Sequence, residues 1–150
     1  MIKGPPSTVA LDPDNNAAAF VGHTADGRQF FLTMPFVPGM VGREPGREFI
    51  ALYLFDPAGR MLTAIIEDLG STDSVVEPAR LARRNELLAS LGDVWYGRIE
   101  VTPFTIERFG TQFGFIPQAP DDPDDDWCVI AQPGDYMCFW PPWNTGDYDT

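Results

Sequence analysis

The segment from Glu48 to Leu69 constrains the fold most, because it holds two apolar runs separated by a turn sequence. The runs Phe49–Phe55 and Met61–Ile66 are rich in β-branched and aromatic residues and are short for helices. Between them lies Asp56-Pro57-Ala58-Gly59, where proline presets φ for a type I turn and the aspartate side chain can bond the turn backbone. The segment therefore predicts a β-hairpin at the centre of a sheet.

Further strands are expected on both sides of this hairpin. Ala17–Gly22 and Arg28–Phe36 flank an Asp-Gly turn signal, and Pro35 suggests an edge or a bulge because proline donates no ladder hydrogen bond. Val94–Thr102 alternates as a strand with one buried face. The remaining strands are expected at Phe104–Phe109 and Gln112–Ile116 and in a last hairpin of Trp127–Ala131 and Tyr136–Trp140.

One helix is predicted, over about Val75 to Leu91. Ser74 and Glu77 have the spacing of a capping box, and Gly92 is a natural C-terminal cap. Three leucines fall on one helical face, which should lie across the sheet: Leu81, Leu88 and Leu91.

These elements predict an α+β fold, with a bent antiparallel sheet of about six to eight strands and one helix packed on a face. The 150 residues suit a single domain, 1–150, with a loose N-terminal lead-in over 1–16 and an acidic loop over 118–126. The loop, QAPDDPDDD, holds five aspartates, whose mutual repulsion should keep it solvated.

The formal net charge of −12 bears on the choice of partner. Phosphate binding needs clustered Lys and Arg, so nucleic acid and anionic membranes are not expected partners, whereas a basic protein is. Solubility alone is the alternative reason for the charge. No apolar stretch reaches the about 20 residues of a membrane span, and the N-terminus lacks the apolar region of a signal peptide, so a cytoplasmic location is expected.

Few residues are suited to catalysis or metal binding. His23 is the only histidine and precedes a turn, so a surface role is expected for it, and His and Cys together supply too few ligands for a typical zinc site. The run Asp121–Asp126 lacks the Gly and Glu positions of an EF-hand loop. Paired carboxylates remain open, because any two acids can meet in space. No catalytic residue, metal site or cofactor is predicted.

Cys128 and Cys138 match no paired zinc or redox motif. They fall on the two arms of the last predicted hairpin, where the loop length decides whether they face each other. Free buried thiols are expected, with a disulfide left open.

Aromatic and acidic residues gather in the C-terminal part of the chain. Aromatic side chains are enriched in binding hot spots, and surrounding carboxylates speed association with basic partners. The alternative is that the tryptophans pack the core or hold the tail. The predicted partner-binding residues are Asp121, Asp122, Asp124, Asp125, Asp126, Trp127, Trp140, Trp143, Asp147 and Tyr148.

The stretches FWPPWNTGDYDT, DGRQFF and ALYLFDPAGR resemble a loose group of short acidic bacterial proteins. Some of these are labelled formate hydrogenlyase regulatory protein, and others lie near toxin–immunity loci. A regulator of transcription would contact DNA, but this chain has no helix-turn-helix pattern and a strongly negative charge.

The sequence favours a non-catalytic acidic interaction protein, of inhibitor or immunity type, that binds a basic protein such as a toxin. The alternatives are a small-molecule or divalent-metal-binding domain, including a carboxylate-dependent enzyme, and a purely structural assembly module.

Overall fold

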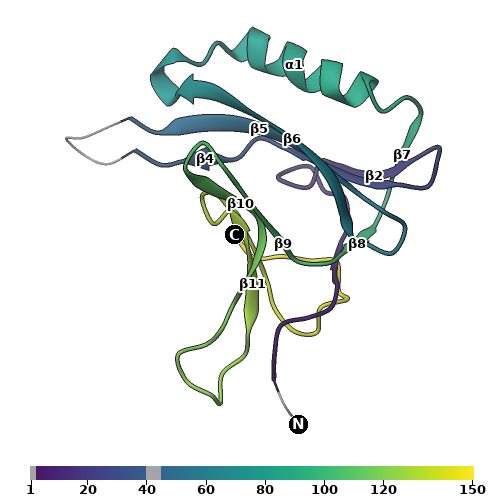
Figure 1. Cartoon of the computed structure of the whole chain (residues 1–150), viewed down its shortest axis with the longest axis vertical. Coiled ribbons are helices and arrows are strands. Elements are labelled where there is room, and N and C mark those ends of the chain that lie inside the picture. Colours follow the sequence, from purple (N-terminus) through teal and green to yellow (C-terminus); the bar gives the residue numbers. More distant parts are fainter. Residues whose placement is uncertain (1–2, 40–44) are drawn as a thin grey trace.

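The computed structural model describes residues 3–39 and 45–150 as antiparallel sheets with one α-helix, α1 (Glu77–Ala89), and a short 3-10 turn. The α+β class is therefore confirmed. The prediction of one bent sheet is wrong, because the strands form three sheets, of six, four and two strands. In Figure 1 the helix lies along one face of the largest sheet, and the smaller sheets lie on its other side.

The largest sheet is built around β5, which pairs with β3, β4 and β6, while β2 joins β3 to β7. Its strands are β2 (Phe20–Thr24), β3 (Gln29–Thr33), β4 (Phe36–Val37), β5 (Arg47–Phe55), β6 (Met61–Ser71) and β7 (Val94–Tyr96).

The hairpin predicted at the centre is confirmed as β5 and β6. An Asp56 carboxylate oxygen accepts from the backbone N–H groups of Ala58 and Arg60, each at 2.9 Å, and the Gly59 N–H donates to the Asp56 carbonyl. Gly59 has φ +97°, a conformation that glycine adopts at little steric cost. The turn sequence therefore sets the geometry of the longest strand pair in the protein.

The two smaller sheets combine the first strand of the chain with strands from its second half. The two-stranded sheet pairs β1 (Val9–Leu11) with β8 (Ile99–Val101), and the four-stranded sheet has the order β12-β11-β10-β9. All three residues of β1 are buried, so the loose lead-in predicted for residues 1–16 is wrong over this strand. The strands of the four-stranded sheet are β9 (Phe104–Arg108), β10 (Thr111–Gln118), β11 (Cys128–Gln132) and β12 (Met137–Phe139).

Two predicted strands are divided. The chain passes from β3 to β4 around Pro35, whose carbonyl accepts from the Phe49 N–H at 3.0 Å. The strand predicted over Val94–Thr102 breaks near Gly97, with β7 in one sheet and β8 in another. The alternation over Val94–Thr102 places Trp95 on the same face as the buried Ile99 and Val101, yet Trp95 is 59% exposed and lies on β7, an edge strand of the main sheet.

Two apolar clusters hold the layers together. The larger lies between the main sheet and the smaller sheets and is rich in aromatic contacts, such as Phe49 with Phe113 at 5.0 Å between ring centroids. The smaller lies under the helix, where Leu87 is buried and Leu88 and Leu91 pack beside it. The predicted leucine face is confirmed for Leu88 and Leu91, whereas Leu81 is not part of this cluster and Leu87, which was not predicted, is its buried centre.

The predicted capping box is wrong. The helix begins at Glu77 with Val76 as N-cap and has no side-chain cap hydrogen bond. Ser74 instead belongs to the 3-10 turn, and its hydroxyl donates to the Ser71 carbonyl at 2.8 Å. Gly92, with φ +73°, follows the helix as predicted.

Gln29 links β3 to the central turn and to β8. Its amide nitrogen donates to the carbonyls of Asp56 and Glu100 at 3.1 and 2.9 Å, and its amide oxygen accepts from the Glu100 N–H at 2.7 Å. Only 4% of Gln29 is exposed, so water cannot easily replace these bonds.

We expect Gln29→Ala to lower the free energy of unfolding by about 2 kcal/mol, because it leaves buried backbone groups without partners. Urea denaturation would measure the change. Gln112→Ala, at an exposed position of β10, is the control and should stay within about 0.5 kcal/mol of the wild type. An equal effect at both positions would contradict the role given to Gln29.

Candidate interaction surface

The acidic loop connects β10 to β11 and is exposed from Asp121 to Asp126. A short turn organises it: the Asp122 carboxylate accepts from the Asp124 N–H at 2.9 Å, and the Asp122 carbonyl accepts from the Asp125 N–H at 3.0 Å. The loop extends from the same end of the molecule as the N-terminal segment (Figure 1). The predicted acidic residues are thus all presented to solvent.

Lys3 is bound against this loop. Its ammonium donates to the Asp124 carbonyl at 2.7 Å and lies 3.5 Å from the Asp126 carboxylate. Lys3, Asp124 and Trp127 border a hollow of about 450 Å³. An ammonium group on a flexible stem therefore finds both a carbonyl and a carboxylate partner at this loop.

Half of the described side-chain carboxylates outside the loop pair with arginines, as Glu67 does with Arg83. Hydrogen bonds from Arg83 lower the pKa of Glu67, and those from Arg98 lower the pKa of Asp12. Over residues 3–39 and 45–150, the loop aspartates form a single ion pair, that of Asp126 with Lys3. The arginine ion pairs are Asp12–Arg98, Asp26–Arg28, Glu48–Arg80, Asp56–Arg60, Glu67–Arg83, Asp68–Arg47, Glu77–Arg80 and Glu86–Arg83.

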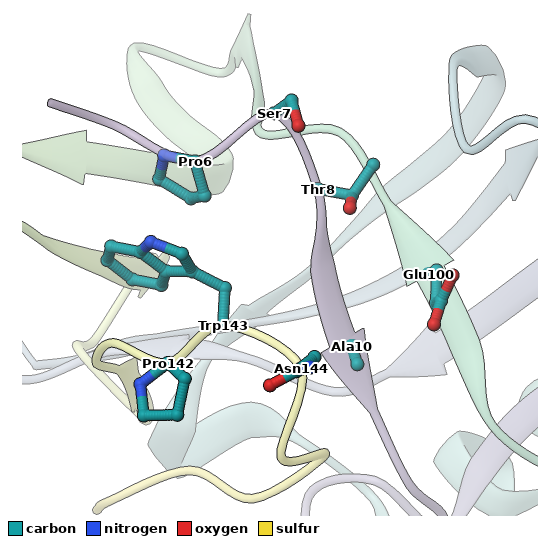
Figure 2. A pocket seen from close by; sticks show the side chains of 8 residues that line it. All are labelled: Pro6, Ser7, Thr8, Ala10, Glu100, Pro142, Trp143 and Asn144. Atoms are coloured by element: carbon teal, nitrogen blue, oxygen red, sulfur yellow. The ribbon is translucent and has the colours of Figure 1, made fainter.

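The C-terminal tail runs along β1 and β12. The Trp143 carbonyl accepts from the Ala10 N–H at 3.0 Å, and Asp149 exchanges two hydrogen bonds of 2.8 Å with Cys138. The Trp143 ring lies between Pro6 and Pro142 at a hollow of about 360 Å³ (Figure 2). Trp143 also packs against the main core, so it holds the tail in place.

Arg98 joins the tail to the N-terminal segment. Its guanidinium makes a two-point contact with the Asp12 carboxylate, at 2.7 and 3.1 Å, and donates to the carbonyls of Asn144 and Thr145. The planar fork of arginine suits such a set of acceptors, which a lysine ammonium cannot match.

We expect Arg98→Lys to release the tail and so to raise its cleavage rate in limited proteolysis several-fold. The reason is that one ammonium cannot replace the contacts to Asp12 and to two tail carbonyls. The control is Arg84→Lys on the helix, whose guanidinium bonds only its neighbour Asn85 and lies over Phe20. Unchanged cleavage in the Arg98 variant would contradict the role of this contact.

Tyr148 holds the tail through a second contact. Its hydroxyl donates to the Asp14 carboxylate, and its ring packs on Phe139 with centroids 6.2 Å apart. Burial and the Asp14 hydrogen bond raise the pKa of Tyr148 to about 12. Asp14 in turn accepts from the backbone N–H groups of Asn16 and Ala18.

We expect the stabilisation from Tyr148 to be lost in alkali. A tyrosine in the unfolded chain titrates near pH 10, whereas Tyr148 in the folded chain keeps its proton up to about 12. Its contribution is therefore complete below about pH 10 and disappears as the pH rises toward 12. Urea denaturation at intervals from pH 8 to 12 should show the gap between wild type and Tyr148→Phe closing over this range. A constant gap would contradict this assignment.

The structure separates the predicted binding residues into two groups. The loop aspartates, Trp127 and Trp140 lie at the open end of the β11–β12 hairpin, and Trp140 is 46% exposed. Trp143 and Tyr148 instead pack against the core and hold the tail, which was the alternative role considered for the tryptophans. Asp147 is exposed between them in the chain. Sequence reasoning did not identify Lys3, Arg98, Asp12 and Asp14, because their contacts cross most of the chain length.

In the part of the chain that the structure describes, no three His, Cys, Asp or Glu side chains converge to hold a metal ion. His23 is a β2 residue whose ring nitrogen contacts the Arg98 carbonyl at 2.6 Å. It borders a hollow of about 360 Å³ that also contains Arg98 and Glu100, away from the acidic loop.

Comparisons with known proteins add no family to this description. No protein-family model matches the chain, and neither a curated protein nor a solved structure is similar to it. Across residues 3–39 and 45–150, the one α-helix falls short of the length and apolar character needed to span a membrane.

Proposed function

We propose that this protein is a non-catalytic acidic interaction protein, of inhibitor or immunity type, that binds a basic protein partner. The contact surface is the acidic loop Asp121–Asp126 together with Trp127 and Trp140. The observation that carries the proposal is the position of Lys3, whose ammonium already rests on the Asp124 carbonyl and near Asp126.

The distribution of charge supports this choice of surface. Arginines neutralise many carboxylates on the sheets and helix, whereas the loop aspartates share one lysine among the described residues. The loop thus carries five carboxylates within six exposed residues, with one cationic partner among the described residues. Such a patch attracts a basic partner over a distance and raises the association rate.

Two tryptophans, the exposed Trp140 and the half-buried Trp127, would add contact area beside the charge. Trp140 follows the last residue of β12, and Trp127 precedes the first residue of β11, so both lie next to the loop. Large aromatic side chains bring much contact area with few rotatable bonds, which is why they are enriched in binding hot spots. Charge would steer the partner, and the two tryptophans would hold it.

The proposal is tested with an oligolysine peptide as a stand-in for a basic partner. We expect binding at low salt, measured by fluorescence anisotropy of a labelled peptide, and an affinity that falls steeply as salt is added. Oligoglutamate of the same length is the control and should not bind. Absence of oligolysine binding, or affinity that does not change with salt, would contradict the proposal.

A further inference from the structure

Cys128 and Cys138 lie on the same face of the β11–β12 hairpin. Cys138 lies opposite Ile130 in the ladder, so these two side chains point to the same face. Cys128 is two residues before Ile130 on β11, and side chains two residues apart on a strand share a face, so Cys128 lies on this face too. Both cysteines are free and half-buried. The opposite face of the hairpin is in the main core and carries Val129, Ala131, Met137 and Phe139.

The backbone of Cys138 brings these side chains closer. Its N–H and carbonyl both bond Asp149, at 2.8 Å each, and therefore point away from β11. The Ile130–Cys138 pair is then of the non-hydrogen-bonded kind, in which facing side chains approach most closely. Cys128 is the diagonal neighbour of Cys138; such neighbours lie about 7–8 Å apart, so a bond between two short thiol side chains requires a small movement of the strand end.

Cys128 lies at the end of the β11–β12 ladder, so a small movement there breaks no pairing with β12, although its backbone is paired with Gln118 of β10. It is the first residue of β11, and the ladder between β11 and β12 starts only at the Val129–Phe139 pair. Burial and the neighbouring Cys128 thiol raise the pKa of Cys138 to about 11.

We propose that Cys128 and Cys138 form an intramolecular disulfide when a small disulfide oxidant such as glutathione disulfide is present. One protein thiolate attacks the oxidant, forming a mixed disulfide and releasing one glutathione thiolate. The second protein thiolate then displaces the bound glutathione. Two protein thiols lose two protons and two electrons, and one glutathione disulfide becomes two glutathione thiols.

The bond would join the two ends of the hairpin that lie beside the acidic loop. It closes a ring around the β11–β12 turn and ties the residue after Trp127 to the strand that holds the tail through Asp149. This modification is independent of the proposed partner, because it depends only on the hairpin.

The test is to equilibrate the native protein with mixtures of reduced and oxidised glutathione at about pH 8.5, where an ordinary thiol is about half ionised, and to continue until Cys138, whose thiol pKa is raised, has also exchanged. Acid quenching and mass spectrometry should show loss of both thiols and about two mass units, reversed by excess reductant. Because the fold holds the thiols together, the native protein should need about tenfold less glutathione disulfide than the chain in urea. Cys128→Ser and Cys138→Ser should each give only the mixed disulfide.

Three results would overturn the proposal. These are glutathione adducts on the wild type without ring closure, two thiols that stay free at every mixture, and an equal oxidant requirement in the native and urea-unfolded chains. Peptide mapping of the wild type locates the bond, so the conclusion does not depend on the folding of either serine variant.

Discussion

The triple variant Asp121→Asn, Asp124→Asn and Asp125→Asn is expected to bind an oligolysine peptide about tenfold more weakly at low salt, at roughly 0.5 kcal/mol for each exposed charge pair lost. The substitutions keep side-chain size and leave Asp122, whose carboxylate organises the turn, unchanged. The backbone that receives Lys3 should therefore survive while the charge is lost. Fluorescence anisotropy across a salt series would measure the affinities.

The matched control removes the same number of charges elsewhere. Asp73→Asn, Asp93→Asn and Glu107→Gln are exposed positions that form no ion pair with another described residue. At the physiological end of the salt series, where the Debye length is about 8 Å, this control should bind within about twofold of the wild type, because only charges close to the bound peptide then contribute. Equal weakening in both triple variants would show that net charge, and not the loop, attracts the peptide.

Features set by neighbouring residues were predictable from the sequence. The Asp56-Pro57-Ala58-Gly59 turn is stabilised by its own side chain and by a glycine at positive φ, so its geometry needs no distant partner. The helix and the glycine that follows it, Gly92, were predictable for the same reason, because both depend on neighbouring residues. The failure at Ser74 was also local: its hydroxyl had a competing acceptor in the Ser71 carbonyl.

Features set by distant residues were not predictable. The alternation over Val94–Thr102 correctly indicated extended chain, but alternation carries no information on which strand lies alongside. The chain crosses there from pairing with β2 to pairing with β1. For the same reason the three residues of β1 looked like part of a loose segment, although β8 buries them.

In the candidate surface, too, locally determined features were predictable and features that depend on distant residues were not. The acidic loop could be predicted because repulsion among its own aspartates keeps it in solvent. The role of Trp143 and Tyr148 depends on Ala10, Asp14 and Phe139, which no spacing in the sequence connects to them. The sequence pattern of aromatic residues in the tail is therefore compatible with both a binding surface and an internal packing role, and does not distinguish them.

Gly114→Ala is expected to destabilise the protein more than any other change considered, by about 4 kcal/mol. Gly114 has φ +134°, a strained conformation for alanine, and an added Cβ would lie 2.1 Å from the Phe104 carbonyl oxygen. The backbone strain costs roughly 1–3 kcal/mol and overpacking a similar amount. Gly114 is buried between Phe113 and Phe115 in β10, so a shift of the strand would disturb the main core.

Two glycine controls separate these causes in the same urea denaturation experiment. Gly110→Ala adds a side chain at φ +68° with no atom within 4 Å, so only strain of about 1–2 kcal/mol is expected. Gly97→Ala meets no atom within 4 Å and has no positive φ, and its effect should stay within about 0.5 kcal/mol. The excess loss at Gly114 over Gly110 then measures the close approach of β9 to β10. A Gly114 variant no less stable than the Gly110 variant would show that the two strands can separate without cost, which contradicts the packing described for this sheet.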